Sequence, residues 1–501
     1  MNIKLNKLLG INNYQLRKIL IRNIKINSKN IKKKDLFIAI KGNKIDANKF
    51  IKEAINKGAN AVISWSKVKN KKIKYINKIP IIYIKNIRKK ISKIAGNFYN
   101  NPSNRLNIIG VTGTNGKTSV TQLISQWINL LGDKSAVIGT LGNGLYGKLI
   151  ETINTTDSAI DIQSYLNFFL KNRVNTVAIE ISSHALDQYR VSSIPFKVGI
   201  FTNISRDHLD YHKNMKKYEK TKWKLFSDHK IENPIINIST KIGMNWFKKI
   251  KSRNKIYIAT TNLKCKYGER WIYAKKVKHE NTRSIIDFNS SWGNGDISVN
   301  LIGNFNVVNI LLSMAALLSL GYSLSSIILT VEKIKPIIGR MQQIYVSNKP
   351  KIIIDYAHTP DALNKVIKII NSIYSKKKLT CIFGCGGDRD KTKRPIMGKI
   401  AEKLSNKVFI TNDNPRTENP NKIIKDILDG FTNPKKAYVI PDRKKAIKVA
   451  VNNSSMNDII LIAGKGSENY QMIGKNKIKY SDEETVLKIL NKKLYDKNIL
   501  K

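Results

Sequence analysis

The chain is poor in cysteine and contains no long apolar run. Only Cys265, Cys381 and Cys385 occur among its 501 residues, too few and too poorly grouped for a disulfide framework or a zinc site. We expect buried, reduced thiols. No stretch of about 18 uncharged apolar residues could span a membrane, and the first segment, MNIKLNKLLG, lacks the apolar core of a signal peptide. We therefore expect a cytoplasmic protein with no membrane partner.

Acidic residues are also scarce. The chain has 35 Asp and Glu against 90 Lys and Arg, a formal net charge of +55. Such a charge raises the possibility of a nucleic-acid-binding protein, because lysine and arginine neutralise phosphates. The excess is mostly lysine, however, and it is spread along the chain with isoleucine and asparagine, as an AT-rich genome would produce. A dense basic tail and an arginine-aromatic stripe are both missing. We expect solvated surface lysines and no nucleic-acid partner.

The length and the hydrophobic pattern indicate about three domains of α/β type. Short apolar runs alternate with helical segments along the whole chain, and nearly continuous apolar strands between helices are typical of mostly parallel sheets covered on both faces. A polar, proline-containing stretch at residues 99–103 and Lys335-Pro336 mark the boundaries. We predict domains at 1–100, 101–335 and 336–501. The expected strands include 35–42, 61–65, 79–84, 106–113, 135–140, 176–182, 197–205, 234–239, 351–357, 379–385, 407–413, 437–440 and 458–464, and a buried helix is expected within 303–321.

A glycine-rich turn follows the strand LNIIGV at 106–111. It reads Gly113, Thr114, Asn115, Gly116, Lys117 and Thr118, and a helical segment comes next. Glycines let backbone N–H groups close around phosphates, the helix N-terminus adds a favourable dipole, Lys117 can neutralise phosphate oxygens, and Thr118 can reach Mg²⁺. Val111 replaces the first glycine of the strict G-x-x-x-x-G-K pattern, so an ordinary turn is the alternative. The order of strand, loop and helix favours a nucleotide-phosphate site.

Charged and imidazole side chains follow two later strands. Glu180 interrupts an apolar strand, where an unpaired carboxylate would be costly, so we expect it to face a cation. A strand-end acid facing solvent is the alternative. His208 follows the strand at 197–205 and could ligate a metal, although a lone histidine is more often structural. Because sites in α/β proteins lie at the carboxyl ends of strands, we expect these residues near the bound phosphates.

Motifs spread over essentially the whole chain resemble those of the Mur ligase family. They are GTNGKT (113–118), EISSHALDQYR (180–190), FTNISRDHLDYH (201–212), TKW (221–223), GNFNVVN (303–309), GRMQ (339–342), DYAHTPDAL (355–363), GCGGDRDKTKRP (384–395), DNPR (413–416) and GKGSE (464–468). The family adds amino acids to the nucleotide-linked precursor of bacterial peptidoglycan. The resemblance implies a small N-terminal α/β domain for the UDP-linked substrate, a central phosphate-loop ATPase domain with a mostly parallel sheet, and a C-terminal Rossmann-like, doubly wound domain for the amino acid.

Within the family, the DNPR motif most resembles the branch that adds meso-diaminopimelate to UDP-N-acetylmuramoyl-L-alanyl-D-glutamate. An arginine offers a bidentate fork for a carboxylate, and Glu468 can receive an ammonium group. The resemblance assigns three sets of contacts. The amino acid is held by Arg389, Asp413, Asn414, Pro415, Arg416, Gly464 and Glu468; the UDP-linked acceptor by Ser28, Asn154, Thr155, Thr156, Ser183, Gln188 and Arg190; and ATP by Gly113, Thr114, Asn115, Gly116, Lys117, Thr118, Ser119, Asn306, Arg340 and Asp355.

The implied reaction forms an acyl phosphate. ATP phosphorylates the D-glutamate γ-carboxylate, and an amine of diaminopimelate then displaces the phosphate. Catalysis should rest on positioning and charge neutralisation by Lys117, nearby arginines and Mg²⁺. By resemblance, Lys222 reacts with CO₂ to form a carbamate that binds magnesium, which requires a lowered amine pKa; a plain surface lysine is the alternative. The expected catalytic residues are Lys117, Glu180, His208 and Lys222, and the expected metal ligands are Thr118, Glu180, His208 and carbamylated Lys222.

The sequence departs from the family pattern at three places. Asn43-Lys44-Ile45 replaces a usual His-Gln-Ala run, Asn27-Ser28-Lys29 replaces Asp-Ser-Arg at the uridine contact, and Ser467 stands where histidine is common. A lysine-adding ligase of the same family is the nearest alternative function, and a folate polyglutamate ligase a more remote one. Arg416 disfavours the first, because a side chain that ends in a plain ammonium gives it no carboxylate to bind. We expect a monomer.

Overall fold

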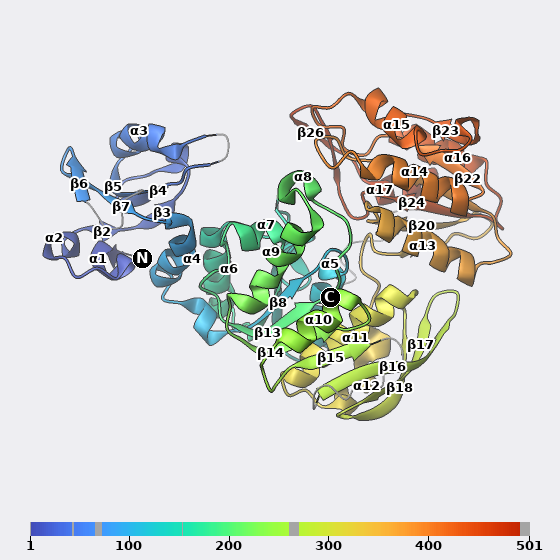
Figure 1. Cartoon of the computed structure of the whole chain (residues 1–501), viewed down its shortest axis with the longest axis horizontal. Coiled ribbons are helices and arrows are strands. Elements are labelled where there is room, and N and C mark those ends of the chain that lie inside the picture. The colour runs from blue at the N-terminus through green and yellow to red at the C-terminus, as the bar shows by residue number, and fades with distance from the viewer. Residues whose placement is uncertain (1, 43–44, 66–72, 153, 260–269, 491–501) are drawn as a thin grey trace. The chain divides into compact units, whose positions relative to one another are not determined.

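A computed structural model describes residues 2–42, 45–65, 73–152, 154–259 and 270–490 of the chain. These residues form two compact units. The first unit comprises residues 1–110, 133–199 and 221–232, and the second comprises residues 111–132, 200–220 and 233–501. Each unit is built around mostly parallel sheets with helices packed on them (Figure 1). Cys265 lies outside the described residues, while Cys381 and Cys385 are free, buried thiols as expected, and burial raises the pKa of Cys381 to about 12.

The N-terminal part of the first unit carries a five-stranded sheet in the order β3-β4-β5-β7-β6. Only β6 runs antiparallel to its neighbour. The strands expected at 35–42, 61–65 and 79–84 are confirmed as β4, β5 and β7, and apolar side chains cover both faces of the sheet. The elements are β1 (Ile3–Lys4), α1 (Leu5–Leu9), α2 (Tyr14–Arg17), β2 (Leu20–Ile21), β3 (Asn23–Lys25), β4 (Asp35–Ala39), α3 (Ile51–Asn56), β5 (Ala59–Trp65), β6 (Ile73–Ile76), β7 (Ile79–Ile84) and α4 (Ile87–Phe98).

The central part of the chain forms an eleven-stranded sheet in the order β11-β10-β9-β12-β8-β13-β14-β15-β16-β17-β18. Its strands are β8 (Asn107–Thr112), β9 (Ser135–Gly139), β10 (Gly142–Leu145), β11 (Lys148–Ile150), β12 (Thr176–Glu180), β13 (Phe196–Phe201), β14 (Ile231–Asn237), β15 (Ile256–Ala259), β16 (Arg270–His279), β17 (Ser284–Ser290) and β18 (Gly293–Val299). Its helices are α5 (Lys117–Leu130), α6 (Ala159–Lys171), α7 (Ser183–Asp187), α8 (Leu209–His212), α9 (Met215–Ser227), α10 (Lys241–Lys249), α11 (Asn304–Ser319) and α12 (Leu324–Thr330). Every strand expected in this part is confirmed, and α11 is the expected buried helix.

Six strands of this sheet, β10, β11 and β15 to β18, were not expected from the sequence. β10 and β11 form an antiparallel extension beside β9, and β16, β17 and β18 form an antiparallel meander at the other edge. The meander strand β17 buries alternate residues, so one of its faces meets the core and the other does not. That period of two is weaker in the sequence than a continuous apolar run, which explains why the antiparallel edge was missed.

The C-terminal part of the second unit is a doubly wound sheet, as predicted, in the order β19-β20-β24-β21-β22-β23. All its pairings are parallel except that of β19. Ile459 and Leu461 face the helices α13 to α15, whereas Ile460 and Ile462 face α16 and α17. The elements are β19 (Gln342–Ile344), β20 (Lys351–Asp355), α13 (Pro360–Ile373), β21 (Leu379–Phe383), α14 (Lys393–Leu404), β22 (Lys407–Ile410), α15 (Pro420–Leu428), β23 (Ala437–Val439), α16 (Arg443–Asn452), β24 (Ile459–Ala463), the hairpin β25 (Tyr470–Ile473) and β26 (Asn476–Lys479), and α17 (Asp482–Ile489).

A buried ion pair joins α17 to this sheet. Arg443 is 2% exposed and Asp482 is 0% exposed. The Arg443 Nε and Nη2 atoms each donate to one Asp482 carboxylate oxygen at 2.8 Å, and Nη2 also donates to the carbonyl of Ala463 at the end of β24. A bidentate pair of this kind compensates two buried charges that would each be costly alone. It therefore fixes α17 against the carboxyl end of β24.

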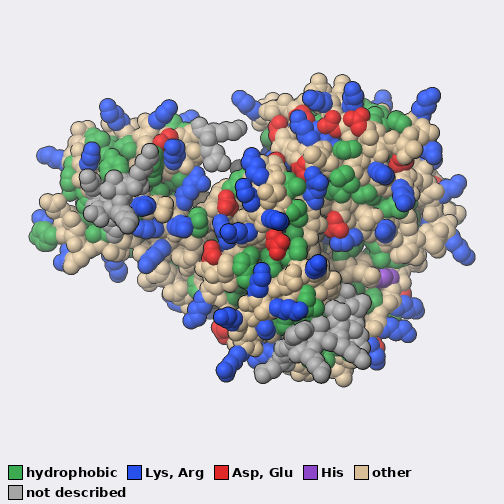
Figure 2. Space-filling view, in the orientation of Figure 1, with side chains coloured by type: hydrophobic (Ala, Val, Ile, Leu, Met, Phe, Trp, Pro, Cys, Tyr) green, Lys and Arg blue, Asp and Glu red, His purple; other side chains and the backbone are tan. Residues whose placement is uncertain are grey.

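The surface charge is dispersed. Lysine and arginine side chains are spread over the visible face of both units, with smaller numbers of acidic side chains among them (Figure 2). This is the distribution expected of solvated surface lysines. Among the described residues, no helix has both the length and the apolar character needed to cross a membrane.

Candidate active site

The predicted phosphate loop connects β8 to α5. Gly113 has a φ of 148°, and a side chain there would collide with the Thr202 hydroxyl, so only glycine fits. Asn203 fixes the loop from the end of β13: its carbonyl accepts from the backbone N–H of Thr114 at 2.8 Å, and its side-chain oxygen accepts from that of Asn115 at 3.1 Å. Val111 is a buried residue of β8 rather than part of the loop. The loop is thus a fixed turn at a helix N-terminus, which is the geometry that binds phosphates.

Lys117 is the first residue of α5. Its ammonium group donates to the carbonyls of Gly113 at 2.9 Å and Thr114 at 2.8 Å, so the loop itself holds the charge in place. Gly116 precedes it with a φ of 87°, and a Cβ there would lie 2.7 Å from the Asn309 side chain of α11. The glycine therefore lets α11 approach the start of α5.

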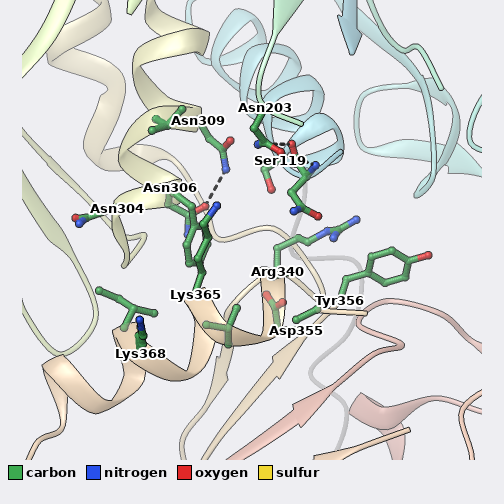
Figure 3. Close-up of a pocket in the computed structure, with 18 of the residues that line it drawn as sticks. Ser119, Asn203, Asn304, Asn306, Asn309, Arg340, Asp355, Tyr356, Lys365 and Lys368 are labelled. Carbon is green, nitrogen blue, oxygen red and sulfur yellow. Dashed lines mark hydrogen bonds between the residues drawn. The ribbon is translucent and has the colours of Figure 1, made fainter. Parts of the chain in front are cut away.

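A cavity of about 610 Å³ opens beside this loop in the second unit (Figure 3). Asparagines of α11 line one side, with Asn309 donating to Asn306 at 3.2 Å, and Lys365 and Lys368 of α13 line another. The volume is in the range of small-molecule sites. Six of the predicted ATP contacts line this cavity: Asn115, Gly116, Ser119, Asn306, Arg340 and Asp355.

Arg340 and Asp355 belong to one fixed corner of the cavity. Arg340 Nη2 donates to the Thr118 hydroxyl at 3.0 Å, and its guanidinium lies 4.3 Å from the ring centre of Tyr356. Asp355 ends β20 and accepts from the backbone N–H of Met341 at 2.8 Å. Burial raises the pKa of Asp355, although the charge of Arg340 opposes the shift. The cavity thus presents one guanidinium to an anion and one carboxyl group.

In the first unit, the structure brings Glu180 together with predicted acceptor contacts. Glu180 is 1% exposed, which excludes the solvent-facing alternative. Its carboxylate accepts from the backbone N–H of Thr140 at 2.8 Å and from the Thr140 hydroxyl at 3.1 Å, and the oxygen of that hydroxyl lies 3.2 Å from the Thr155 hydroxyl. The Thr156 hydroxyl donates to the Glu180 carbonyl at 2.6 Å. Thr155 and Thr156 therefore lie at the carboxyl end of β12, in contact with Thr140 and Glu180.

Other acceptor contacts join the same network, and one stands apart. Arg190 donates to the Thr156 carbonyl and to the side-chain oxygen of Gln188, while Ser183 is buried at the start of α7. Ser28 lies on the 3₁₀ helix η1 (Ser28–Asn30), where its hydroxyl donates to Glu53 at 3.1 Å. It is not part of the Glu180 network. Asn43 and Lys44 lie outside the described residues.

The predicted metal ligand His208 lies beside the carboxylate of Asp207. His208 Nε2 lies 3.3 Å from Asp207 Oδ2, and Asp207 also faces His358. Burial alone would raise the pKa of Asp207, but the charges of His208, His358 and Lys393 hold it well below its usual value. Among the described residues, no three His, Cys, Asp or Glu side chains gather as a metal site. Thr118 and His208 belong to the second unit and Glu180 and Lys222 to the first, so the shared magnesium site stays a prediction.

Lys222 lies on α9 and is 1% exposed. The plain surface lysine considered from the sequence is therefore wrong. Burying an ammonium group away from water is costly unless partners compensate its charge, and charged lysines are seldom fully buried. Its burial indicates that Lys222 has a structural or a chemical role. The carbamate stays a prediction.

The predicted amino-acid contacts form one cluster at the carboxyl ends of β21, β22 and β24. The Asn414 side chain is held by three hydrogen bonds. Its oxygen accepts from Met472 N at 2.8 Å and from Lys465 Nζ at 3.1 Å, and its Nδ2 donates to Glu468 at 2.9 Å. Lys465 Nζ also donates to Glu468 at 2.8 Å. Arg416 Nη1 donates to the Gly387 carbonyl at 2.9 Å.

Asp413, Gly464 and Arg389 complete this cluster. Burial would raise the pKa of Asp413, but the charges of Lys465, Arg443 and Arg416 lower it below its usual value. A Cβ on Gly464 would lie 2.8 Å from an Asp413 carboxylate oxygen, so the glycine makes room for that carboxylate. Arg389 is exposed, and it lies with Arg416 beside Gly386. The cluster thus offers two arginines and the carboxylates of Asp413 and Glu468, which matches an amino acid that carries both signs of charge.

A buried ion pair next to this cluster predicts acid sensitivity. Hydrogen bonds from Arg394 lower the pKa of Glu418 to about 2, against an ordinary 4.5. The stabilisation is complete above about pH 5 and is lost as the pH falls toward 2. Urea unfolding from pH 5 to pH 3 should therefore show a steeper fall in the free energy of unfolding for the wild type than for Glu418→Gln. Glu232→Gln, which removes an exposed carboxylate paired with Lys197, should keep the wild-type slope. Parallel wild-type and Glu418→Gln curves would refute the pKa shift.

Several residues of these sites were not singled out from the sequence. Asn203, Asn309, Tyr356 and Lys365 line the cavity, and Lys465 organises the amino-acid cluster. All but Lys365 lie inside motifs already recognised, so position within a motif was the available signal. Thr140 and Asn143 lie outside every motif. Asn143 is 0% exposed on β10 and joins Gly139 to Asp157, a long-range role that the sequence does not signal.

Comparisons with known proteins agree with this geometry. Three family models match: the Mur ligase family catalytic domain at residues 20–99, the Mur ligase middle domain at 111–317, and the Mur ligase glutamate ligase domain at 339–466. The UDP-N-acetylmuramoyl-L-alanyl-D-glutamate--2,6-diaminopimelate ligase of Buchnera aphidicola subsp. Schizaphis graminum is 52% identical over 94% of this chain and 95% of its own. Its counterpart in Haemophilus influenzae strain Rd is 44% identical over 94% and 96%.

Solved structures show the same fold. A UDP-N-acetylmuramoyl-L-alanyl-D-glutamate--2,6-diaminopimelate ligase matches with a TM-score of 0.67 at 29% identity, covering 98% of this chain and 99% of that one. A MurF ligase from Thermotoga maritima in complex with ADP matches with a TM-score of 0.63 at 19% identity, covering 93% and 96%. With close relatives along nearly its whole length and matching models for each part, the chain belongs to the Mur ligase family.

Proposed function

We propose that this chain is an ATP-dependent ligase that adds meso-diaminopimelate to the D-glutamate γ-carboxylate of UDP-N-acetylmuramoyl-L-alanyl-D-glutamate. The observation that carries the proposal is the cluster of Arg389, Arg416, Asn414 and Glu468 at the strand ends of the C-terminal sheet. Two guanidinium groups suit carboxylates and a fixed carboxylate suits an ammonium group. The relatives named above, at 44–52% identity, carry the name of this activity. Given these substrates, we propose the cytoplasm as the location and a monomer as the working form.

The cavity beside the phosphate loop is the proposed ATP site. The N-terminus of α5, the Lys117 ammonium and Arg340 offer positive potential to phosphates, while asparagines of α11 and the apolar Phe305 and Val308 offer a wall for a base and ribose. Mg²⁺ prefers oxygen ligands, and the Thr118 hydroxyl and the Glu180 carboxylate are of that kind. Mg²⁺ would supply neutralisation of phosphate charge. We propose His208 and carbamylated Lys222 as its further ligands.

The chemistry then needs little covalent help from the protein. The γ-carboxylate of D-glutamate attacks the γ-phosphorus of ATP, the bond to the β-phosphate oxygen breaks, and ADP leaves. The diaminopimelate amine attacks the resulting acyl carbon, phosphate leaves, and the amine gives up its proton. Residues 154–156, Ser183, Gln188 and Arg190 are the proposed acceptor contacts, and Ser28 a proposed contact for the uridine. The protein's contribution is to hold the carboxylate and the amine in attacking geometry.

Phosphate release tests the substrate assignment. We expect release from ATP in the presence of the UDP-linked dipeptide to be fast with meso-diaminopimelate, slow with L-lysine and slower still without an amino acid. Arg416 has a left-handed φ of 52°, which asparagine tolerates, so Arg416→Asn removes the guanidinium with little backbone strain. This variant should lower kcat/KM for diaminopimelate on the order of 10²-fold.

The comparison with lysine is the control. L-lysine has no distal carboxylate, so its slow rate should change little in Arg416→Asn, which separates lost recognition from lost folding. Equal or faster turnover with L-lysine in the wild type would contradict the proposal and favour the lysine-adding branch. Salt-sensitive retention on DNA without any amino-acid-dependent phosphate release would favour a nucleic-acid-binding protein instead.

A further inference from the structure

Two loops carry most of the proposed amino-acid contacts. The 384–392 loop follows β21 and contains Arg389, while the 411–419 loop follows β22 and contains the segment from Asp413 to Arg416. Each loop places one residue in the left-handed region, Asp388 at a φ of 54° and Arg416 at 52°. Such conformations are costly for side chains other than glycine and persist where surrounding contacts enforce them.

The loops are bound to each other directly. Gly387 N donates to the Asn414 carbonyl at 2.9 Å, and Arg416 Nη1 returns a bond to the Gly387 carbonyl at 2.9 Å. A side chain at Gly387 would collide with the Pro415 carbonyl, so the two backbones are in close contact. Thr417 N donates to Asp388 at 3.1 Å. The position of Arg389 therefore depends on that of residues 413–416.

The buried Arg394 side chain forms hydrogen bonds with residues of both loops. It lies in the first turn of α14 and is 0% exposed. Its Nη1 and Nη2 donate to the two carboxylate oxygens of Glu418 at 2.8 and 2.7 Å, and its Nη2 also donates to the Gly386 carbonyl at 3.3 Å. Glu418 in turn accepts from Asp388 N at 3.1 Å. A second carboxylate, Asp426 of α15, accepts from Nη1 at 2.7 Å.

These hydrogen bonds require a guanidinium group. Its planar fork reaches both oxygens of one carboxylate together with a neighbouring carbonyl, whereas a single ammonium group cannot cover the same acceptors. Removing it would take from Asp426 its ion-pair partner and leave Glu418 paired with Lys391 at 3.4 Å, without the bidentate fork. None of its hydrogen bonds runs to the proposed substrates' contact residues. Its influence therefore passes through the backbone of the two loops.

We propose that Arg394 is a positioning residue for the amino acid, holding the 384–392 loop against the 411–419 loop so that Arg389 and Arg416 meet the substrate together. The inference rests on the proposed function, because it takes the amino acid to be diaminopimelate. It assigns a role in recognition to a side chain that does not contact the substrate. The cavity proposed for ATP is lined by other residues. Loss of the Arg394 side chain should therefore change the KM for diaminopimelate more than the KM for ATP.

Arg394→Ala tests this. We expect kcat/KM for diaminopimelate to fall on the order of 10²-fold while KM for ATP changes less than about twofold, because small displacements of positioning groups have effects of that size. Guanidinium ion at millimolar concentration should restore much of the diaminopimelate activity by filling the deleted site. Urea has a similar shape without the charge and should not restore it. An unchanged KM for diaminopimelate, or equal losses for both substrates, would overturn the proposal.

Two further variants keep the test decisive. Ile447→Ala opens a cavity in the apolar cluster on the opposite face of the same sheet, so it lowers stability without touching the loops. It should leave the ratio of the two KM values unchanged and should not respond to guanidinium. If Arg394→Ala does not fold, Glu418→Asp retracts the carboxylate by one methylene and should raise KM for diaminopimelate alone; a wild-type KM would refute this positioning role. A wild type that releases no phosphate with diaminopimelate would instead refute the proposed function.

Discussion

Lys117→Met is expected to reduce ATP-dependent phosphate release on the order of 10³-fold. The ammonium group is the cation that the phosphate loop holds at the start of α5, through the carbonyls of Gly113 and Thr114. Methionine keeps the length and the apolar stem but removes the charge that would stabilise the phosphoryl group in transfer. We therefore expect the effect mainly in kcat, measured as phosphate release at saturating ATP and acceptor.

The control for this variant is Lys444→Met. Lys444 is an exposed lysine of α16, so its replacement removes one positive charge from the same unit without touching the loop. It should retain wild-type kcat. A Lys117→Met protein within tenfold of the wild type, with a wild-type thermal transition, would show that residues 113–118 do not form the phosphate site.

Lys222→Ala is expected to lower turnover on the order of 10²- to 10³-fold, the range observed when one preorganised electrostatic group is removed from an active site. Lys222 is 1% exposed, and as a carbamate it would become an anionic oxygen donor for Mg²⁺. Alanine removes the donor but leaves space that a small carboxylate can fill. Turnover should therefore rise when acetate or formate is added, and wild-type activity should fall when CO₂ and bicarbonate are removed from the buffer.

Two outcomes distinguish the carbamate from a structural lysine. A lysine that only packs should give a variant with a lower thermal transition and no response to added carboxylates. Lys224→Ala, which removes the neighbouring ion pair of Lys224 with Asp187 at the surface, supplies the matched control and should not respond either. Normal turnover in Lys222→Ala would remove the basis for the carbamate altogether.

The parts of the fold that the sequence predicts well are those with continuous apolar strands. Residues 351–357 and 458–464 are buried on both faces, so nearly every position is apolar and the pattern is unambiguous. The meander strand β17 was missed because one of its faces is not part of the core, and its alternating polar residues resemble a loop. The two strands of the hairpin β25–β26 lie near the surface and carry lysines and polar residues, so their pairing with each other depends on contacts outside the local pattern.

The site residues also fall into those that the sequence identifies and those that it does not. Residues in a local motif, such as Gly113 and Lys117, were identified because the chemistry and the spacing are contiguous in the chain. Glu180 could be recognised because a carboxylate in an apolar strand requires a partner. Arg394 could not, because its importance comes from Glu418 and Asp426, 24 and 32 residues away, and only the fold brings them together. Thr140, which donates a hydrogen bond to Glu180 from 40 residues away, was missed for the same reason. The predicted domain limits and the roles of the site residues stay predictions.

The ion pair between Arg443 and Asp482 sets a condition on the order of folding. Arg443 is in place once α16 has been synthesised, but its buried charge has no bidentate partner until residue 482 has left the ribosome. A nascent chain that ends before Asp482 would have to bury an uncompensated guanidinium or keep the end of the sheet open. During translation, the C-terminal sheet should therefore close only after residue 482 has emerged.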